Sequence, residues 1–387
     1  MAELLVVDYL RAGGTYESLL ADHAVHAKPH NGKVSFIYDQ IAARDEDRVA
    51  QQCRGLILRE HTHEVVAYPF DRFFNHGQGA AAAVDWGTAR CEEKLDGSLL
   101  IVYWDDAAKR WHCATRSMCE AHGNINGAGT FADLADACAR AIYPVTAKTL
   151  HDAMVYVGAD RDVTLMFELT GPYNRVVCEY PSLGLTLLGA RRLSDFAELE
   201  PTAIAERLGF KTPRTWGFAN VADLVETIRE WSPLQFEGVI VKDAAFNRVK
   251  VKSPAYVAAH RATDSLGSSW RNVCEAILTG HADDVMQCVP PFVRDRIESL
   301  RPVVAQLAEQ TERDYAELRG IDDMKTFALA AQQRAWSSPL FALKRGKTES
   351  VGAFLAQTQP DTVLDLCRKL GWQEPAIAPL DMGATNG

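Results

Sequence analysis

Short apolar runs bounded by Gly, Asp or Pro recur along the first 255 residues. They are rich in β-branched, leucine or aromatic residues and predict strands at residues 99–104, 163–168 and 236–241. The stretches with a helical pattern are residues 131–143, 195–208 and 221–231. Because strands and helices do not alternate regularly, the pattern favours an α+β fold, with antiparallel sheets flanked by helices, over a doubly wound parallel sheet.

The strand pattern fades after residue 255. Apolar residues then recur at positions 293, 297, 300, 304 and 307, which is helical spacing. A further helix is predicted at residues 361–370, with Asp361 as its N-cap and Gly371 ending it. We therefore predict a first domain at residues 1–255 and an all-α C-terminal domain at residues 256–387, whose residues 383–387 form a frayed tail.

Charge and cysteine content narrow the class of protein. The formal net charge of −10 argues against a protein that coats nucleic acid non-specifically, but it leaves room for a local basic groove. Nine cysteines are scattered without a close Cys-x-x-Cys pair, so a disulfide framework or zinc ribbon is not expected and a reducing cytoplasm fits. No run approaches the roughly 18 apolar residues of a membrane span. The histidines at 23, 26, 30, 61 and 63 lack the spacing of a zinc site.

One lysine stands in a chemically suggestive place, directly before a predicted strand, in the sequence Glu92-Glu93-Lys94-Leu95-Asp96-Gly97-Ser98. An amine attacks a phosphate only when deprotonated, and nearby cations or a metal ion can lower the pKa of a lysine. Asp96 would orient the lysine or the water around a metal ion, and Gly97 would let the backbone approach a nucleotide closely. Taken alone, these residues also fit a charged β-turn between two strands.

Further motifs accompany this lysine in a fixed order. They are Cys53-Arg54-Gly55-Leu56-Ile57-Leu58, Pro69-Phe70-Asp71-Arg72-Phe73-Phe74-Asn75, Lys94-Leu95-Asp96-Gly97-Ser98-Leu99, Phe167-Glu168-Leu169 with Asn174-Arg175-Val176-Val177, Glu237-Gly238-Val239-Ile240-Val241, and Lys250-Val251-Lys252-Ser253. The ordered set resembles the covalent nucleotidyltransferases, and most closely the bacteriophage T4-type RNA ligase 1 family. The resemblance runs from about residue 50 to 285.

The resemblance implies an ATP-dependent RNA ligase that carries AMP on Lys94, passes it to an RNA 5′-phosphate and then joins a 3′-hydroxyl. It implies ATP as substrate, Mg²⁺ or Mn²⁺ as metal, and single-stranded or nicked RNA, including tRNA, as partner in RNA repair. We expect a monomer in the cytoplasm, which is the host cytoplasm if the chain is phage-encoded. The first domain would be the adenylyltransferase, and the helical domain would contribute RNA or tRNA specificity.

The resemblance also assigns residues to the nucleotide. Lys250 and Lys252 alternate along a strand, so both side chains face one side and would stabilise a leaving pyrophosphate. A solvent-facing lysine pair is the alternative. Arg54 would contact phosphate unless it forms a surface salt bridge, and Phe74 would lie against adenine or RNA unless it is a core residue. Gly238 would allow a close backbone approach.

Oxygen ligands suit Mg²⁺ or Mn²⁺. The resemblance places Glu168 near the ribose and the metal and Glu237 near the metal, although either could instead pair with an arginine on an edge strand. Asp96 is a further metal candidate. Asp283 is another, because the family has an acidic pair at this point; a helix N-terminal carboxylate is the alternative.

Two positions depart from the family, which usually has lysine where this chain has Arg72 and Arg116. Arginine keeps the charge and adds a fork that suits phosphate, so both stay nucleotide-binding candidates. DNA ligases and capping enzymes share the nucleophile motif, but they commonly have arginine at the position of Leu99 and a β-barrel after the last motif, where this chain is helical. A non-catalytic RNA-binding protein of the same fold is the alternative of another class.

Overall fold

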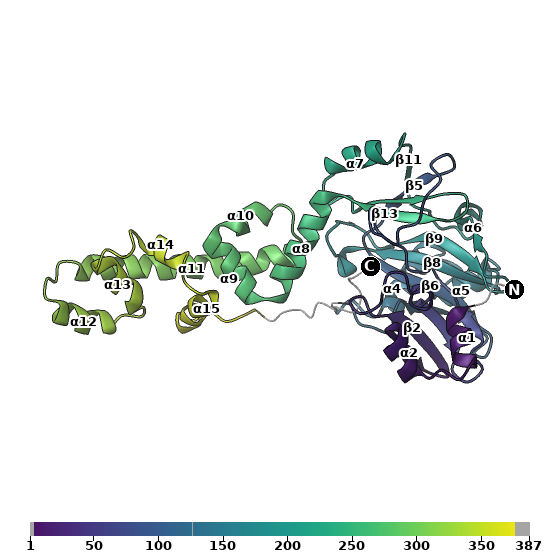
Figure 1. The fold of residues 1–387 in the computed structure, drawn as a ribbon, viewed down its shortest axis with the longest axis horizontal. Coiled ribbons are helices and arrows are strands. Elements are labelled where there is room, and N and C mark those ends of the chain that lie inside the picture. The colour runs from purple at the N-terminus through teal and green to yellow at the C-terminus, as the bar shows by residue number, and fades with distance from the viewer. Residues whose placement is uncertain (1–3, 126, 376–387) are drawn as a thin grey trace. The chain divides into compact units, whose positions relative to one another are not determined.

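The computed structural model describes residues 4–125 and 127–375, and the chain divides between Val257 and Ala258 into two compact units. The tail expected at residues 383–387 lies outside the described residues. Strands in the first unit pair antiparallel and helices cover them, while the second unit is built from helices (Figure 1). The predicted α+β fold with an all-α C-terminal part is confirmed. No helix of the described chain combines the length and apolar character needed to cross a bilayer.

The described residues of the first unit form three sheets. One has the order β1 (Val25–His30), β2 (Lys33–Tyr38), β3 (Arg54–Arg59), β4 (Val65–Ala67). The central one has the order β10 (Glu198–Leu199), β9 (Gly184–Arg192), β8 (Val163–Thr170), β6 (Ser98–Asp105), β7 (Arg110–Thr115). The third has the order β11 (Thr215–Trp216), β5 (Arg90–Lys94), β12 (Gly238–Lys242), β13 (Arg248–Lys252). The helices of this unit are α1 (Leu5–Arg11), α2 (Tyr16–His23), α3 (Arg48–Gln52), α4 (Phe131–Ile142), α5 (Leu150–Tyr156), α6 (Pro201–Arg207) and α7 (Val221–Arg229), with a short 3₁₀ turn at Pro172–Asn174.

The central sheet is buried on both faces because its strands alternate between two cores. Leu100 and Val102 of β6 belong to a core shared with α4 and α5. Ile101 and Tyr103 belong to a core shared with the sheet of β3 and β4. Side chains along a strand point to alternate faces, so one strand serves both layers.

The third sheet uses only one face for packing. Val239, Val241 and Val251 pack with Leu224 and Ile228 of α7, and all five are buried. Figure 1 shows α7 beside this sheet. Most alternate positions of the same strands carry polar side chains, among them Lys94, Lys250 and Lys252, and these face the opposite side.

The helices of the second unit follow α8 (Pro254–Ser268), which begins in the first. They are α9 (Trp270–Thr279), α10 (His281–Val285), α11 (Pro291–Leu318), α12 (Met324–Gln332), α13 (Ser337–Lys344), α14 (Val351–Leu355) and α15 (Pro360–Lys369). The apolar positions predicted on α11, 293, 297, 300, 304 and 307, are all buried in one core with α9 and α15.

Three element predictions need correction. Residues 195–208 are not one helix, because Phe196 has a positive φ of 59° and Pro201 can only start a helix. The strand expected from 236 begins at Gly238, since the amide of Phe236 closes a turn onto the carbonyl of Ser232. Helix α15 begins at Pro360, so Asp361 lies in its first turn and is not the N-cap.

Candidate active site

Lys94 is the last residue of β5 and lies at the centre of the polar face of the third sheet. Gly238 on β12 pairs with Lys94 on one side and with Lys252 of β13 on the other. Lys250 stands two residues earlier on β13 and shares this face. Three motifs that are far apart in the sequence thus meet along one line across the sheet.

Glu237 lies between two of these lysines. Its Oε2 accepts a hydrogen bond from Lys94 Nζ at 2.6 Å, and its Oε1 is 3.1 Å from Lys252 Nζ. Burial raises the pKa of Glu237, but the two lysines outweigh it, and the pKa lies below its usual range. Burial lowers the pKa of Lys94, but Glu237 and Glu168 outweigh it, and the pKa lies above its ordinary value. In the ligand-free site Lys94 is therefore an ammonium held by Glu237.

Two glycines let strands approach closely around Lys94. A Cβ on Gly97 would lie 2.2 Å from the carbonyl oxygen of Leu169. A Cβ on Gly238, whose φ is 155°, would lie 2.2 Å from the carbonyl oxygen of Val251. The structure thus explains both glycines by contacts between strands, and their close approach to a nucleotide stays a prediction.

Asp96 is buried and fully engaged by the protein. Its Oδ2 accepts hydrogen bonds from the amides of Val177 and Cys178 at 2.9 and 2.8 Å. Its Oδ1 accepts one from the hydroxyl of Tyr256 at 2.7 Å. Burial and the charge of Glu237 raise the pKa of Asp96. Asp96 therefore ties the loop after Lys94 to the segment that follows β8 and to α8.

Glu168 lies on β8, opposite Leu99 of β6. Its Oε1 accepts a hydrogen bond from the amide of Gly97 at 3.0 Å. Burial, partly offset by the charge of Lys94, raises the pKa of Glu168 to about 7. Among the described residues, the ligand atoms of Asp96, Glu168 and Glu237 do not all lie within 4.8 Å of one another, so these predicted metal ligands are not a preformed cage.

A cluster of half-buried and buried cations is the most unusual feature of the site. We call Arg54, Arg116 and Lys250 the cation cluster; in the described part of the chain none of them has a carboxylate within 4 Å. Arg54 Nη1 is buried without any hydrogen-bond partner there. Burial and neighbouring positive charges lower the pKa of Arg116 to about 10 and hold that of Lys250 well below its ordinary value. Unpaired buried charge of one sign destabilises a fold, so a bound anion is the natural partner.

Phe73, which the sequence analysis passed over, is the aromatic residue of this cluster. Arg54 lies 5.7 Å and Lys250 Nζ lies 4.8 Å from its ring centroid. Phe74 is buried instead and lies 4.9 Å from the guanidinium of Arg72. Alternation along an extended segment places neighbouring side chains on opposite sides, which was the signal available in the sequence.

Two predicted residues have other partners. Arg72 Nη2 donates to Asp45 at 2.6 Å, and its guanidinium lies 4.6 Å from the ring centroid of Tyr38. Asp283 lies on α10 in the helical unit, where it accepts from Arg301 at 2.6 Å. Their roles at a nucleotide and a metal ion stay predictions.

Comparisons with known proteins agree with the ordered motifs. A model of the RNA ligase family matches residues 52–256. A putative bifunctional polynucleotide kinase/RNA ligase of Autographa californica nuclear polyhedrosis virus is 28% identical over 93% of this chain and 52% of its own. An RNA ligase of Rhodothermus phage RM378 is 23% identical over 68% of this chain and 71% of its own. An archaeal ATP-dependent RNA ligase is 14% identical over 75% of this chain and 71% of its own, with a TM-score of 0.43.

The chain spans about half the length of the baculovirus relative. The family match ends at residue 256 and does not reach Asp283. It includes Arg54, Lys94, Glu168, Glu237 and Lys250, which the structure brings to one site. The chain therefore belongs to the RNA ligase family, as its motifs predicted.

Proposed function

We propose that this chain is an ATP-dependent RNA ligase that carries AMP on Lys94 as a covalent intermediate. The observation that carries the proposal is the cation cluster beside Lys94. Arg54, Arg116 and Lys250 offer several donors and no carboxylate of their own to satisfy them, and a nucleoside triphosphate supplies that charge.

In the first step, Lys94 Nζ attacks the α-phosphorus of ATP. A phosphorus–nitrogen bond forms, the bond from the α-phosphorus to the bridging oxygen breaks, and pyrophosphate leaves. Lys250 and Lys252 stabilise the charge that develops on the leaving group. Two further steps transfer AMP to an RNA 5′-phosphate and release AMP when a 3′-hydroxyl attacks.

The amine must first lose the proton that it shares with Glu237. In the ligand-free site the carboxylates of Glu237 and Glu168 hold the pKa of Lys94 high, which favours the ammonium. Glu237 Oε2 accepts a hydrogen bond from Lys94 Nζ at 2.6 Å, and its own pKa lies below the usual range, so it holds the ammonium. Positive charge next to Glu237 and Glu168 is therefore needed to release the amine.

The carboxylates of Glu168 and Glu237 beside Lys94 suit a divalent metal ion, because Mg²⁺ and Mn²⁺ prefer oxygen ligands. Glu168 and Glu237 would hold it. When bound, it would supply positive charge that lowers the pKa of Lys94 and offsets the charge on the phosphates. Asp96, whose oxygens accept from the protein, positions the loop after Lys94.

The function of the two units follows as part of the proposal. The first unit would be the adenylyltransferase, and the helical unit would add specificity for RNA, including nicked tRNA. The chain would act as a monomer, in the cytoplasm.

The test is to incubate the chain with Mg²⁺ and ATP labelled at its α-phosphate and to measure label that stays bound to the denatured protein. We expect a label on Lys94, its loss with EDTA, and sealing of a 5′-phosphorylated RNA. Lys325→Ala, an exposed lysine in α12, is the matched control and should label fully. Labelling by GTP as well as by ATP would indicate a capping-type enzyme, and no adduct would contradict catalysis.

A further inference from the structure

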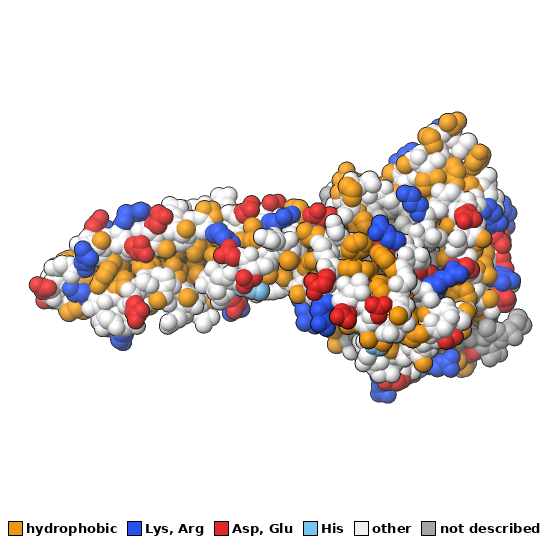
Figure 2. Space-filling model, turned by 90° about the horizontal axis from the view of Figure 1, so that it is seen from above, with side chains coloured by type: hydrophobic (Ala, Val, Ile, Leu, Met, Phe, Trp, Pro, Cys, Tyr) orange, Lys and Arg blue, Asp and Glu red, His pale blue; other side chains and the backbone are white. Residues whose placement is uncertain are grey.

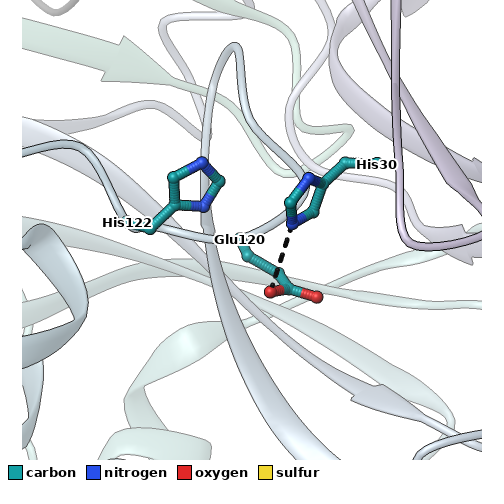
Figure 3. Close-up of side chains that lie close together, drawn as sticks. All are labelled: His30, Glu120 and His122. Atoms are coloured by element: carbon teal, nitrogen blue, oxygen red, sulfur yellow. Dashed lines mark ion pairs between the residues drawn. The ribbon is translucent and has the colours of Figure 1, made fainter.

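Away from Lys94, the first unit brings together two histidines and a glutamate from distant parts of the chain. His30 ends β1, and Glu120 and His122 follow β7. Ligand atoms of the three residues all lie within 4.8 Å of one another. Figure 3 shows the two imidazole rings next to the Glu120 carboxylate. His30 Nε2 lies 3.5 Å from Glu120 Oε2, and the two imidazole centroids are 4.9 Å apart.

The carboxylate of Glu120 is oriented by the buried Lys33 and the exposed Asn31. Its Oε1 accepts from Lys33 Nζ at 3.3 Å and from the Asn31 amide at 3.4 Å. Lys33 is only 2% exposed and also donates to Asp105 at 2.7 Å, so its charge has a partner of its own. This arrangement leaves Oε2 turned toward His30. A ligand fixed by hydrogen bonds to its second oxygen is typical of built metal sites.

The other amino-terminal histidines do not join this group. His23 Nδ1 lies 2.8 Å from Asp47, and His26 Nε2 lies 3.2 Å from Asp39. His30 therefore belongs to a different environment from its sequence neighbours. Its partners are about 90 residues away in the sequence, which is why spacing along the chain did not indicate a site.

We propose that His30, Glu120 and His122 bind a Zn²⁺ ion. Two imidazole nitrogens and one carboxylate oxygen suit this borderline metal, and the exposed side of His122 leaves room for water as a fourth ligand. Mg²⁺ prefers oxygen ligands and is not expected to compete. This site shares no residue with the one around Lys94 and does not depend on the proposed ligase function.

The effect of the ion follows from where its ligands lie. His30 belongs to the sheet of β1 to β4, whereas Glu120 and His122 follow a strand of the central sheet. An ion held by all three would join these two layers. Because the ligands come together only in the folded chain, Zn²⁺ would increase the free energy of unfolding.

The experiment is calorimetric titration of the EDTA-stripped, full-length chain with ZnCl₂. We expect one Zn²⁺ per chain, unaffected by excess Mg²⁺, and a rise in melting temperature. His30→Ala and His122→Ala should each weaken binding by about tenfold or more. His61→Ala, an exposed histidine elsewhere in the unit, is the matched control and should bind like the original chain.

A second measurement separates this site from the nine cysteines. Co²⁺ bound by nitrogen and oxygen should show visible d–d absorption without a thiolate charge-transfer band. His122 is exposed, so His122→Ala should stay folded, with an unchanged circular dichroism spectrum and unchanged Lys94 adenylylation. Absence of Zn²⁺ binding, binding that survives both histidine substitutions, or a thiolate band would overturn the proposal.

Discussion

Both units bury a cation against an aromatic ring, but in different settings. Lys250 lies over Phe73 within a cluster of like charges and interacts electrostatically with the buried Glu237. Arg296 of α11 lies 4.1 Å from the ring centroid of Trp270, inside an apolar core. On the face seen in Figure 2, the acidic and basic side chains of the helical unit are interspersed.

This difference in charge pairing distinguishes a ligand-binding site in the first unit from structural packing in the helical unit. In the helical unit, Arg334 pairs with Asp314 and Arg301 with Asp283, so these cations meet a carboxylate of the chain itself. In the cation cluster of the first unit, Arg54, Arg116 and Lys250 instead repel one another, and none of them has a carboxylate within 4 Å in the described chain. Charge that weakens the fold and gathers at one place indicates a ligand, whereas a single cation on a ring indicates packing.

The largest effect is expected at Lys94. Lys94→Ala should abolish the AMP adduct and the sealing of a 5′-phosphorylated RNA, because it removes the amine that would carry AMP. Lys94→Arg should fail as well, since a guanidinium does not lose its proton near neutral pH. The measurement is labelling with ATP followed by acid precipitation. An adduct in Lys94→Ala would show that the nucleophile lies elsewhere.

The comparison between the two buried cations can be tested directly. Lys250→Met should reduce the rate of adenylylation by about 100-fold or more, because it removes a positive charge that stabilises the leaving pyrophosphate. It should also raise the free energy of unfolding by about 1 to 3 kcal/mol, because it removes a buried charge that has no partner. The rate is measured by single-turnover labelling with ATP, and the free energy of unfolding by urea titration without ATP or metal.

Arg296→Ala is the matched variant in the helical unit. It should lower the free energy of unfolding by about 1 to 3 kcal/mol, since the arginine stem and its ring contact are lost. Adenylylation should stay unchanged. If both variants change stability in the same direction, the distinction between a site and a scaffold fails.

Many residues of this site could be predicted from the sequence, but the long-range contacts that hold them in place could not. Period-two alternation correctly placed Lys250 and Lys252 on one face of β13, and the ordered motifs picked out Lys94, Glu168 and Glu237. Neither the alternation nor the motifs could show that Tyr256 donates to Asp96, because the two residues are 160 positions apart. The pairing of Glu198 with Arg248 at 3.1 Å was equally hidden, because it spans 50 positions. Long-range pairing depends on strand order, which no local pattern contains.

In one segment a proline prevents the single helix that the sequence pattern predicted. The helical composition of residues 195–208 suggested a single element, but Pro201 has no amide hydrogen to continue a helix from the preceding residues. The chain therefore forms β10 first, and Glu198 on that strand pairs with Arg248 and Arg191. The missed strand supplies the carboxylate that keeps Arg248 out of the cation cluster.

Glu168 should make the free energy of unfolding of the chain depend on pH. Its pKa of about 7 in the folded chain lies above the ordinary value of 4.5. Between these values the folded chain holds a proton that the unfolded chain has released, so the free energy of unfolding falls as pH rises from 4.5 to 7. Glu168→Gln removes this term, and without metal it should be more stable than the original chain at pH 8, by on the order of 2 kcal/mol.

The measurement is urea unfolding in EDTA across this pH range. Glu312→Gln, an exposed residue of α11, is the control and should keep the original slope. A Glu168→Gln variant with the same pH dependence as the original chain would show that the carboxyl is ionised throughout, and that the cation cluster neutralises it without a ligand.

The smallest effect is expected in the helical unit, whose contribution to RNA binding must be local. Residues 261–387 contain 14 Lys and Arg against 17 Asp and Glu, so attraction of RNA by overall charge is not expected. Lys344, Arg345 and Lys347 form a basic group at the end of α13, with no carboxylate within 4 Å in the described chain.

Replacing all three by alanine should weaken sealing of a nicked tRNA by roughly 3- to 10-fold and make binding less dependent on salt, because phosphate contacts are lost. Adenylylation and sealing of a short unstructured RNA should not change, since the group lies outside residues 52–256, which carry the motifs of the site around Lys94. Equal losses on both RNAs would place these residues in the general reaction, and no loss on either would remove the helical unit's basic group from substrate recognition.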